Sequence, residues 1–350
     1  MNFPPFRKFF FCRNVAVVAV ICGITLCSGA SIAQTTAFRQ AVAENAAADE
    51  TIAAWYRSTG YKGLWTGADD AERRNALFTV LASAGDHGLP TAKYDSAALR
   101  LAYFDVRNEG DVGRLEVMMT KAFLHYAHDV HSGVLTPAKI DPGIVRDVPL
   151  IDPNISLAAI NTSDPLAYLR SLPPTGSAYA LLMKEKINLQ RQILTQGWGE
   201  TVSANSVKPG TSGPAVVQLR NRLVALGYLP LSATQTYDAK IEAAVQEFQV
   251  NTGLEATGIA SESTIAQINV SPEDRLKSVL VALERERWLN IDRGDRYVWV
   301  NLTDFSAKII DHGKVTFATR SVIGKNVSDR RTPEFSDEIE FADSFPAAEQ

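Results

Sequence analysis

The order of apolar and polar residues along the chain predicts a mainly helical protein with strands towards its C-terminal end. Between residues 114 and 130, the apolar positions recur every three or four residues, the period of an amphipathic helix. They are Leu115, Met118, Met119, Ala122, Phe123 and Tyr126. Similar periods follow over 164–172 and 178–194. We expect a mainly helical domain over 51–205, preceded by a flexible leader or loose first helix over 34–50.

A compact unit follows over 214–270, after a linker rich in Ser, Gly and Pro over 206–213. Three short amphipathic helices are expected in it. Pro214 starts the first, Asp238 caps the second and Ser261 caps the third. Three such helices bury one small core.

The period changes to two after a further amphipathic helix in 273–289. Residues 297–302 alternate, and SAKIIDHGKVTFATRSVIG is typical of two strands joined at His312-Gly313. This β region has at most about 50 residues, too few for an independent β domain. The expected fold class is therefore α+β multidomain: a helical scaffold, a three-helix unit and an incomplete β-rich domain.

The first 33 residues are typical of a cleavable export signal. Three basic residues, Arg7, Lys8 and Arg13, precede an apolar run over 15–26, and small residues end at Ala33. The run is too short to span a hydrocarbon core of about 30 Å. We expect cleavage after Ala33, a periplasmic location and no stable membrane anchor afterwards. An uncleaved N-terminal anchor is the alternative.

Charge and cysteine content narrow the possible functions. The chain carries 35 Lys and Arg against 39 Asp and Glu, and three of the basic residues lie in the signal, so nucleic acid is not expected as a partner. The three cysteines, Cys12, Cys22 and Cys27, also lie there. After cleavage, residues 34–350 hold no cysteine for a disulfide, a thiolate metal site or a nucleophile.

The unit over 214–270 resembles the peptidoglycan-binding-like domain. The resemblance rests on LRNRLVALGYL, on YD, on AVQEFQ and on GLEATG. It implies peptidoglycan as the partner. Among the residues of this unit that we expect to be exposed, wall contacts are expected from Arg220, Arg222, Tyr228 and Gln249.

The flanking segments resemble the scaffold-containing type of periplasmic L,D-transpeptidase. Upstream, the motifs are WYRSTGYKGLWTG and LEVMMTKAFLHYAHDVHSGVLTPAKI; downstream, they are LERERWL, VWVNLTDFSAKIIDHGKV and RRTPEFSDEIE. The resemblance implies a catalytic domain that begins within 271–340, with Arg331, Thr332 and Pro333 at the border of its cleft. Such enzymes form an acyl-enzyme on a cysteine thiolate and transfer the acyl group to the amine of a second stem peptide.

The resemblance fails over 341–350, FADSFPAAEQ, and no Ser-His-Gly-Cys stretch occurs. We therefore expect a truncated L,D-transpeptidase that is catalytically inactive as this polypeptide. The alternative is a non-catalytic exported protein that binds peptidoglycan or acts as a scaffold. A third reading is a remnant with a folding defect, whose β segment 297–340 exposes unpaired edges.

Other candidate chemistry has weaker support. His125, His128 and His131 follow one another at three-residue steps on a helix, so their side chains fan out and favour a polar face over a metal site. No cofactor is expected, and nothing in the sequence sets an oligomeric state. Aromatic residues could stack on sugars, although core packing is the more common role. They are Trp55, Tyr56, Trp65, Tyr228, Tyr237 and Trp288.

Overall fold

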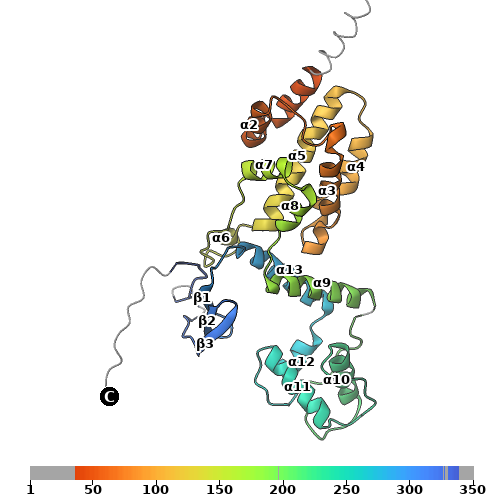
Figure 1. Ribbon diagram of the computed structural model, residues 1–350. Helices are drawn as coiled ribbons and strands as arrows, with labels where there is room; N and C mark the ends of the chain where they lie inside the picture. The colour runs from red at the N-terminus through yellow and green to blue at the C-terminus, as the bar shows by residue number, and fades with distance from the viewer. Residues whose placement is uncertain (1–35, 196, 326, 328–329, 339–350) are drawn as a thin grey trace, which may run out of the picture. The chain divides into compact units, whose positions relative to one another are not determined.

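The computed structural model describes residues 36–195, 197–325, 327 and 330–338. The fold is α+β, as expected: helices form most of it, and one antiparallel sheet lies towards the C-terminal end of the described residues (Figure 1). The predicted signal over 1–33 and the tail over 341–350 lie outside these residues. No helix within them is long and apolar enough to cross a membrane.

The chain forms two compact units that alternate along the sequence. The first takes its described residues from 1–83, 91–127 and 151–170, and the second from 84–90, 128–150 and 171–350. The range 51–205, expected as one scaffold domain, is thus shared between the two units. Hydrophobic periodicity identifies helices, but it carries no information on which helices share a core.

The first unit is helical, and α5 continues from it into the second. Its elements are α2 (Glu50–Ser58), η1 (Ala68–Asp70), α3 (Ala71–Ala82), η3 (Thr91–Lys93), α4 (Ser96–Phe104), α5 (Glu109–Ser132), α7 (Pro153–Thr162) and α8 (Pro165–Ser171). Residues 36–46 are helical, the second of the two forms expected for the segment 34–50. Val42 and Ala46 are fully buried there against Ile52 and Tyr56. Burial of these apolar side chains stabilises the leader as part of the unit.

A buried carboxylate holds a loop of the first unit against α5. The side chain of Glu116 has no exposed surface. Its donors are the hydroxyl of Tyr56, the backbone N–H groups of Leu64, Trp65 and Thr66, and the hydroxyl of Thr66. Because buried polar groups need hydrogen-bond partners, this cluster fixes residues 64–66 on the helix.

The second unit holds the remaining elements. They are η2 (Ala84–His87), α6 (Pro137–Ile140), α9 (Ser177–Leu194), α10 (Pro214–Ala225), α11 (Ala239–Asn251), α12 (Glu262–Asn269), α13 (Pro272–Trp288), β1 (Arg296–Asn301), β2 (Ser306–Asp311) and β3 (Lys314–Arg320).

The helix α13 packs along α9 and is fastened to earlier parts of the chain by two buried charges. Arg287, 1% exposed, donates Nη2 to Glu284 Oε2 at 2.8 Å and Nη1 to the carbonyl of His87 at 2.9 Å. Glu284 Oε1 in turn accepts from the backbone N–H of Leu135 at 2.7 Å. The motif LERERWL, expected to lead into a catalytic domain, therefore joins α13 to residues 84–90 and 128–135.

The three helices α10, α11 and α12 form as expected around one core. Pro214 begins α10, and the carboxylate of Asp238 caps α11 by accepting from the N–H groups of Lys240 and Ile241, each at 3.0 Å. Ser261 stands at the N-cap of α12, without a side-chain bond to a helix N–H. The core consists mainly of Val216, Leu219, Leu223, Tyr237, Ile241, Val245, Phe248, Ile265 and Ile268.

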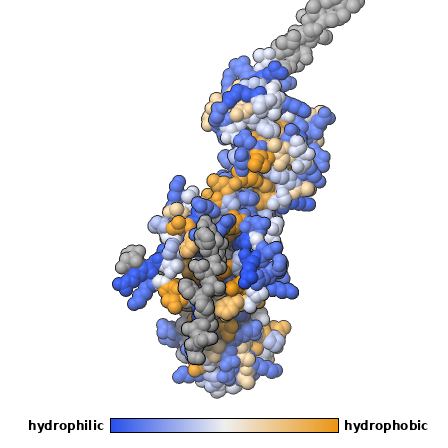
Figure 2. All heavy atoms as spheres, turned by 60° about the vertical axis from the view of Figure 1, so that its left-hand side comes forward, coloured by the Kyte–Doolittle hydropathy of each residue, from blue (hydrophilic) through white to orange (hydrophobic). Residues whose placement is uncertain are grey.

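The sheet has the order β1-β2-β3 and is antiparallel throughout. His312 and Gly313 form the predicted turn between β2 and β3, with φ of 46° and 76°, the positive values of a type I′ hairpin. Every residue of β3 is exposed, including the apolar Phe317, and Val298 of β1 is exposed as well. Apolar side chains also reach the surface among polar ones in other places (Figure 2).

Candidate functional site

The three-helix unit carries four of the residues expected to contact a ligand, and the structure separates them. Gln249 is internal, with 1% of its surface exposed. Its Nε2 donates to the carbonyl of Ile259 at 2.9 Å and to Thr264 Oγ1 at 3.0 Å, while its Oε1 accepts from the N–H of Gly258 at 3.0 Å. The side chain of Gln249 thus fastens the loop before α12 and is unavailable to a ligand.

Arg220 lies on the surface of α10 and bonds locally. Its guanidinium donates to Asn221 Oδ1 at 2.8 Å and to the carbonyl of Thr234. It therefore ties α10 to the segment that leads into Tyr237, and it stands apart from the cluster described next.

A cluster of two arginines and one tryptophan forms where α12 meets α13. The guanidinium carbons of Arg222 and Arg275 lie 5.5 and 5.2 Å from the ring centroid of Trp198. Trp198 is 7% exposed and Arg222 is 3% exposed, whereas Arg275 is half-buried. Aromatic faces attract cations at such distances, so the indole holds both charges close to it. We call Trp198, Arg222 and Arg275 the arginine–tryptophan cluster.

Both arginines also bind the last carbonyls of α12. Arg222 Nη2 donates to the carbonyl of Ile268 at 2.8 Å, and Arg275 Nη2 donates to that of Gln267 at 2.9 Å. These carbonyls lie in the last turn of α12 and carry the negative end of its dipole; that of Gln267 also accepts from the N–H of Val270 at 3.4 Å. The cluster therefore closes α12 and couples it to α13.

Tyr228 is an electrostatic neighbour of Arg275 in this cluster. It is half-buried, with its ring edge-on to Phe248 at 5.3 Å, and its hydroxyl accepts from Asn251 Nδ2 at 3.4 Å. The structure thus brings Arg222 and Tyr228, two of the four predicted contact residues, to the surroundings of Arg275.

The electrostatics of the cluster reflect crowding of positive charge. Burial, and then the neighbouring Arg275, lower the pKa of Arg222 below its usual range. Burial also lowers the pKa of Arg275, while Tyr228 and Glu185 act in the opposite direction. In the described part of the chain, no carboxylate forms an ion pair with either guanidinium.

The residues expected at the border of a catalytic cleft lie elsewhere in the second unit. Arg331 forms an ion pair with Asp141 at 2.7 Å, which lowers the pKa of that carboxyl. Thr332 Oγ1 accepts from the N–H of Gly324 at 2.7 Å, and Pro333 is exposed. The next residue, Glu334, bonds to the backbone of residues 143–145 as a parallel bridge. The segment is thus anchored on the loop after α6.

The three helical histidines have separate surroundings. The Nδ1 atoms of His128 and His131 contact Asp129 and Ser132, their neighbours in the sequence, at 2.9 and 3.1 Å. His125 is exposed. Among the residues that the structure describes, no group of three potential ligands lies close enough to hold a metal ion.

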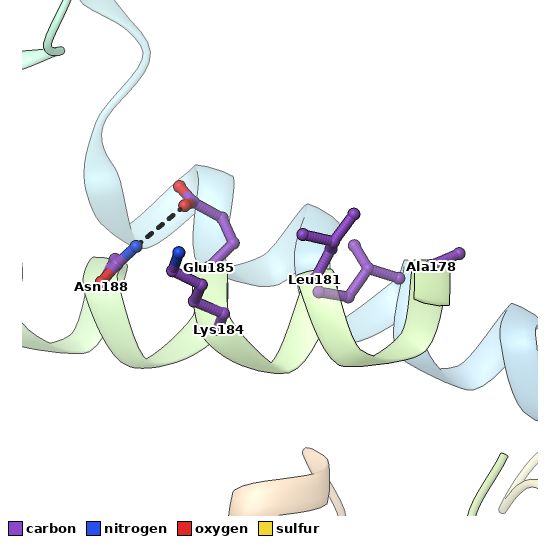
Figure 3. Close-up of a pocket in the computed structure, with 6 residues that line it drawn as sticks. Ala178, Leu181, Lys184, Glu185 and Asn188 are labelled. Atoms are coloured by element: carbon purple, nitrogen blue, oxygen red, sulfur yellow. Dashed lines mark hydrogen bonds between the residues drawn. The ribbon is translucent and has the colours of Figure 1, made fainter. Parts of the chain in front are cut away.

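A shallow hollow of about 610 Å³ lies along α9. Ala178 and Leu181 form its apolar end, while Lys184, Glu185 and Asn188 form its polar end (Figure 3). Asn188 Nδ2 donates to Glu185 Oε2 at 3.4 Å, the bond drawn in Figure 3. This bond turns the carboxylate of Glu185 along its own helix.

Two residues of the cluster escaped the sequence reasoning. Trp198 lies in a Gly-Trp-Gly stretch after α9, and Arg275 is one of several charges at the start of α13. The available signal was a tryptophan between two glycines in a polar segment, because a large aromatic side chain is rarely left in solvent.

Comparison with known proteins places two domains in the chain. Residues 50–185 match the family model of the Scaffold domain, and residues 212–268 match that of the Putative peptidoglycan binding domain. No curated protein matches the chain. The arrangement of a Scaffold domain followed by a peptidoglycan-binding domain is consistent with the architecture of L,D-transpeptidases. The second match supports peptidoglycan as a partner and, with it, a role related to the cell wall.

Proposed function

We propose that this protein is a periplasmic relative of the L,D-transpeptidases whose residues 34–350 bind peptidoglycan and do not cross-link it. The observation that carries the proposal is the match of 212–268 to a peptidoglycan-binding domain, directly after a Scaffold match over 50–185. The helices α10–α12 surround one apolar core, to which residues before α10 such as Val202 and Val207 also contribute.

Binding without acyl transfer follows from the chemistry of residues 34–350. A thioester intermediate needs a thiolate, and this range contains no cysteine. A serine could replace it only beside an accessible histidine. Ser132 and His131 are in contact at 3.1 Å, but Ser132 is 1% exposed and donates its hydroxyl to the carbonyl of Pro149 at 2.6 Å. This hydroxyl is therefore neither accessible nor activated as a nucleophile.

The test of binding is co-sedimentation of the purified chain, residues 34–350, with peptidoglycan sacculi at physiological salt. We expect most of the protein to sediment with sacculi and to remain soluble with cellulose as the control polymer. Soluble stem peptides added in excess should release it. Equal amounts in both pellets would refute specific wall binding.

The test of catalysis uses the same preparation with tetrapeptide stems as both donor and acceptor. We expect no cross-link between the third residues of two stems by mass spectrometry, whereas an active L,D-transpeptidase run in parallel produces it. Appearance of this product with residues 34–350 alone would refute the proposed inactivity.

The proposed location is tested by expressing the whole chain and sequencing the N-terminus of the exported protein. Removal of the basic and apolar signal predicts a mature protein that begins at Gln34 and is released with the periplasmic fraction. A protein that keeps residues 1–33 and pellets with membranes would instead favour the N-terminal anchor.

A further inference from the structure

We propose that Arg222 and Arg275 form a binding site for a carboxylate group of a peptidoglycan stem peptide, with Trp198 as its floor. The inference rests on the proposed wall binding and makes it more specific. It assigns a ligand group to the arginine–tryptophan cluster, which spans the end of the wall-binding helices and the start of α13.

The first argument is the charge balance. Arginines are rarely buried without a charged partner, yet Arg222 is 3% exposed and its hydrogen bonds go to the carbonyls of Ile268 and Val270. The C-terminus of α12 supplies the equivalent of about half a negative charge against two positive ones. The cluster therefore keeps a net positive charge, for which an anion is the natural complement.

The second argument is the hydrogen-bond balance. The Nε–H group of Arg222 and that of Arg275 are both buried, and neither has an acceptor. A buried unsatisfied donor costs about 1–3 kcal/mol, and a native structure with two such donors in one cluster calls for an acceptor. A carboxylate has two oxygens and matches the planar edge of a guanidinium, so it suits these donors.

The third argument is access. Arg222 is 3% exposed, whereas Arg275 and Tyr228 are half-buried and so keep some contact with solvent. Glu185, which raises the pKa of Arg275, is hydrogen-bonded to Asn188, as Figure 3 shows. It forms no ion pair with the guanidinium of Arg275. The guanidinium of Arg275 can therefore pair with a carboxylate of a ligand that binds from solvent.

Peptidoglycan stem peptides fit this chemistry because they carry free carboxylates on a short chain of small residues. A free anion such as acetate or phosphate shares the charge but lacks the peptide. The two sources differ in one measurable respect: a stem peptide would also contact the neighbouring surface around Tyr228, and would bind more tightly than its carboxylate alone.

The experiment is isothermal titration of residues 34–350 with a soluble stem tetrapeptide and with the same peptide amidated at its carboxyl groups. We expect the free acid to bind at least about tenfold more tightly than the amide, as for a charge-assisted pair. R275Q should remove this preference. R170Q is the matched control, because Arg170 is exposed on α8 of the first unit and was not predicted to contact the wall, so it should bind like the wild type. Thermal melting confirms that both variants are folded.

Each outcome has one reading. A free-acid preference that R275Q removes and R170Q retains supports the site. If wild-type protein sediments with sacculi but binds acid and amide equally, or R275Q keeps the preference, the site is wrong and the proposed function stands. Competition by acetate or phosphate at the same concentration as the peptide would show a general anion site and overturn the stem-peptide assignment. Failure to sediment with sacculi refutes the proposed function itself.

Discussion

Replacement of Glu116 by glutamine should strongly destabilise the first unit. The two carboxylate oxygens accept from the backbone N–H groups of Leu64, Trp65 and Thr66 and from two hydroxyls, and the side chain is fully buried. Glutamine offers one oxygen and one NH₂ group. In either orientation, its NH₂ faces at least one backbone N–H, because a hydroxyl can rotate to accept but a backbone N–H cannot.

The magnitude follows from the donors that E116Q leaves unsatisfied. The NH₂ group of glutamine replaces one carboxylate oxygen. The N–H of Leu64 or that of Thr66 then loses its acceptor, and the N–H of Trp65 loses one of its two. At about 1–3 kcal/mol for each buried donor, one full and one shared donor lower the free energy of unfolding by about 2–4 kcal/mol. The phenol of Tyr56 remains a donor in E116Q, since burial, the main cause of its raised pKa, persists without the carboxylate.

The assay combines urea denaturation with hydrogen exchange of the peptide that contains residues 62–68. E116Q should shift the midpoint to lower urea and speed exchange at 64–66. E50Q is the control: Glu50 forms an exposed ion pair with Arg57 and should change the free energy of unfolding by less than about 1 kcal/mol. A loss under about 1 kcal/mol in E116Q, with unchanged exchange at 64–66, would refute the reasoning.

Three further predictions concern the second unit. Burial, and then Arg287, lower the pKa of His87, so folding favours the neutral imidazole. The melting temperature should therefore be constant above about pH 6.5 and should fall as the pH drops from about 6.5 towards the lower pKa of the folded state. The fall should be smaller in H87Q. G133A should lower the melting temperature by several degrees, because Gly133 has a φ of +97° and an added Cβ would lie 2.6 Å from Glu284; S177A, at an exposed position, should have no effect. Q249L should cost about 2 kcal/mol in denaturation experiments, since it leaves the N–H of Gly258 without its acceptor; an unchanged midpoint would contradict the assigned role.

Much of the local structure was predictable from short-range pattern. The three-residue period and the N-terminal residues Pro214 and Asp238 gave α10 and α11 their start points, and the structure confirms both. The strand alternation and the His312-Gly313 turn were likewise confirmed, because a two-residue hairpin needs positive φ at both positions. These features depend on neighbours within a few residues.

The predicted contact residues show where this reasoning ends. Arg222 and Gln249 are polar and were expected at the surface, but both are buried. Their side chains satisfy backbone groups 46 and 10 residues away, at Ile268 and Ile259. A polar residue with a distant partner is indistinguishable in sequence from one that faces water.

By itself, the sequence determined the helices α5 and α8–α13, the start points of α10 and α11, the hairpin and the absence of cysteine from residues 34–350. These depend on local periodicity, backbone preference and composition. Only the tertiary structure decided that residues 36–46 are packed, that residues 51–205 are shared between two units, and that α13 is joined to residues 84–90 and 128–135. It also decided that Trp198, Arg222 and Arg275 meet. The physical reason is that burial and charge pairing depend on contacts between segments far apart in the chain.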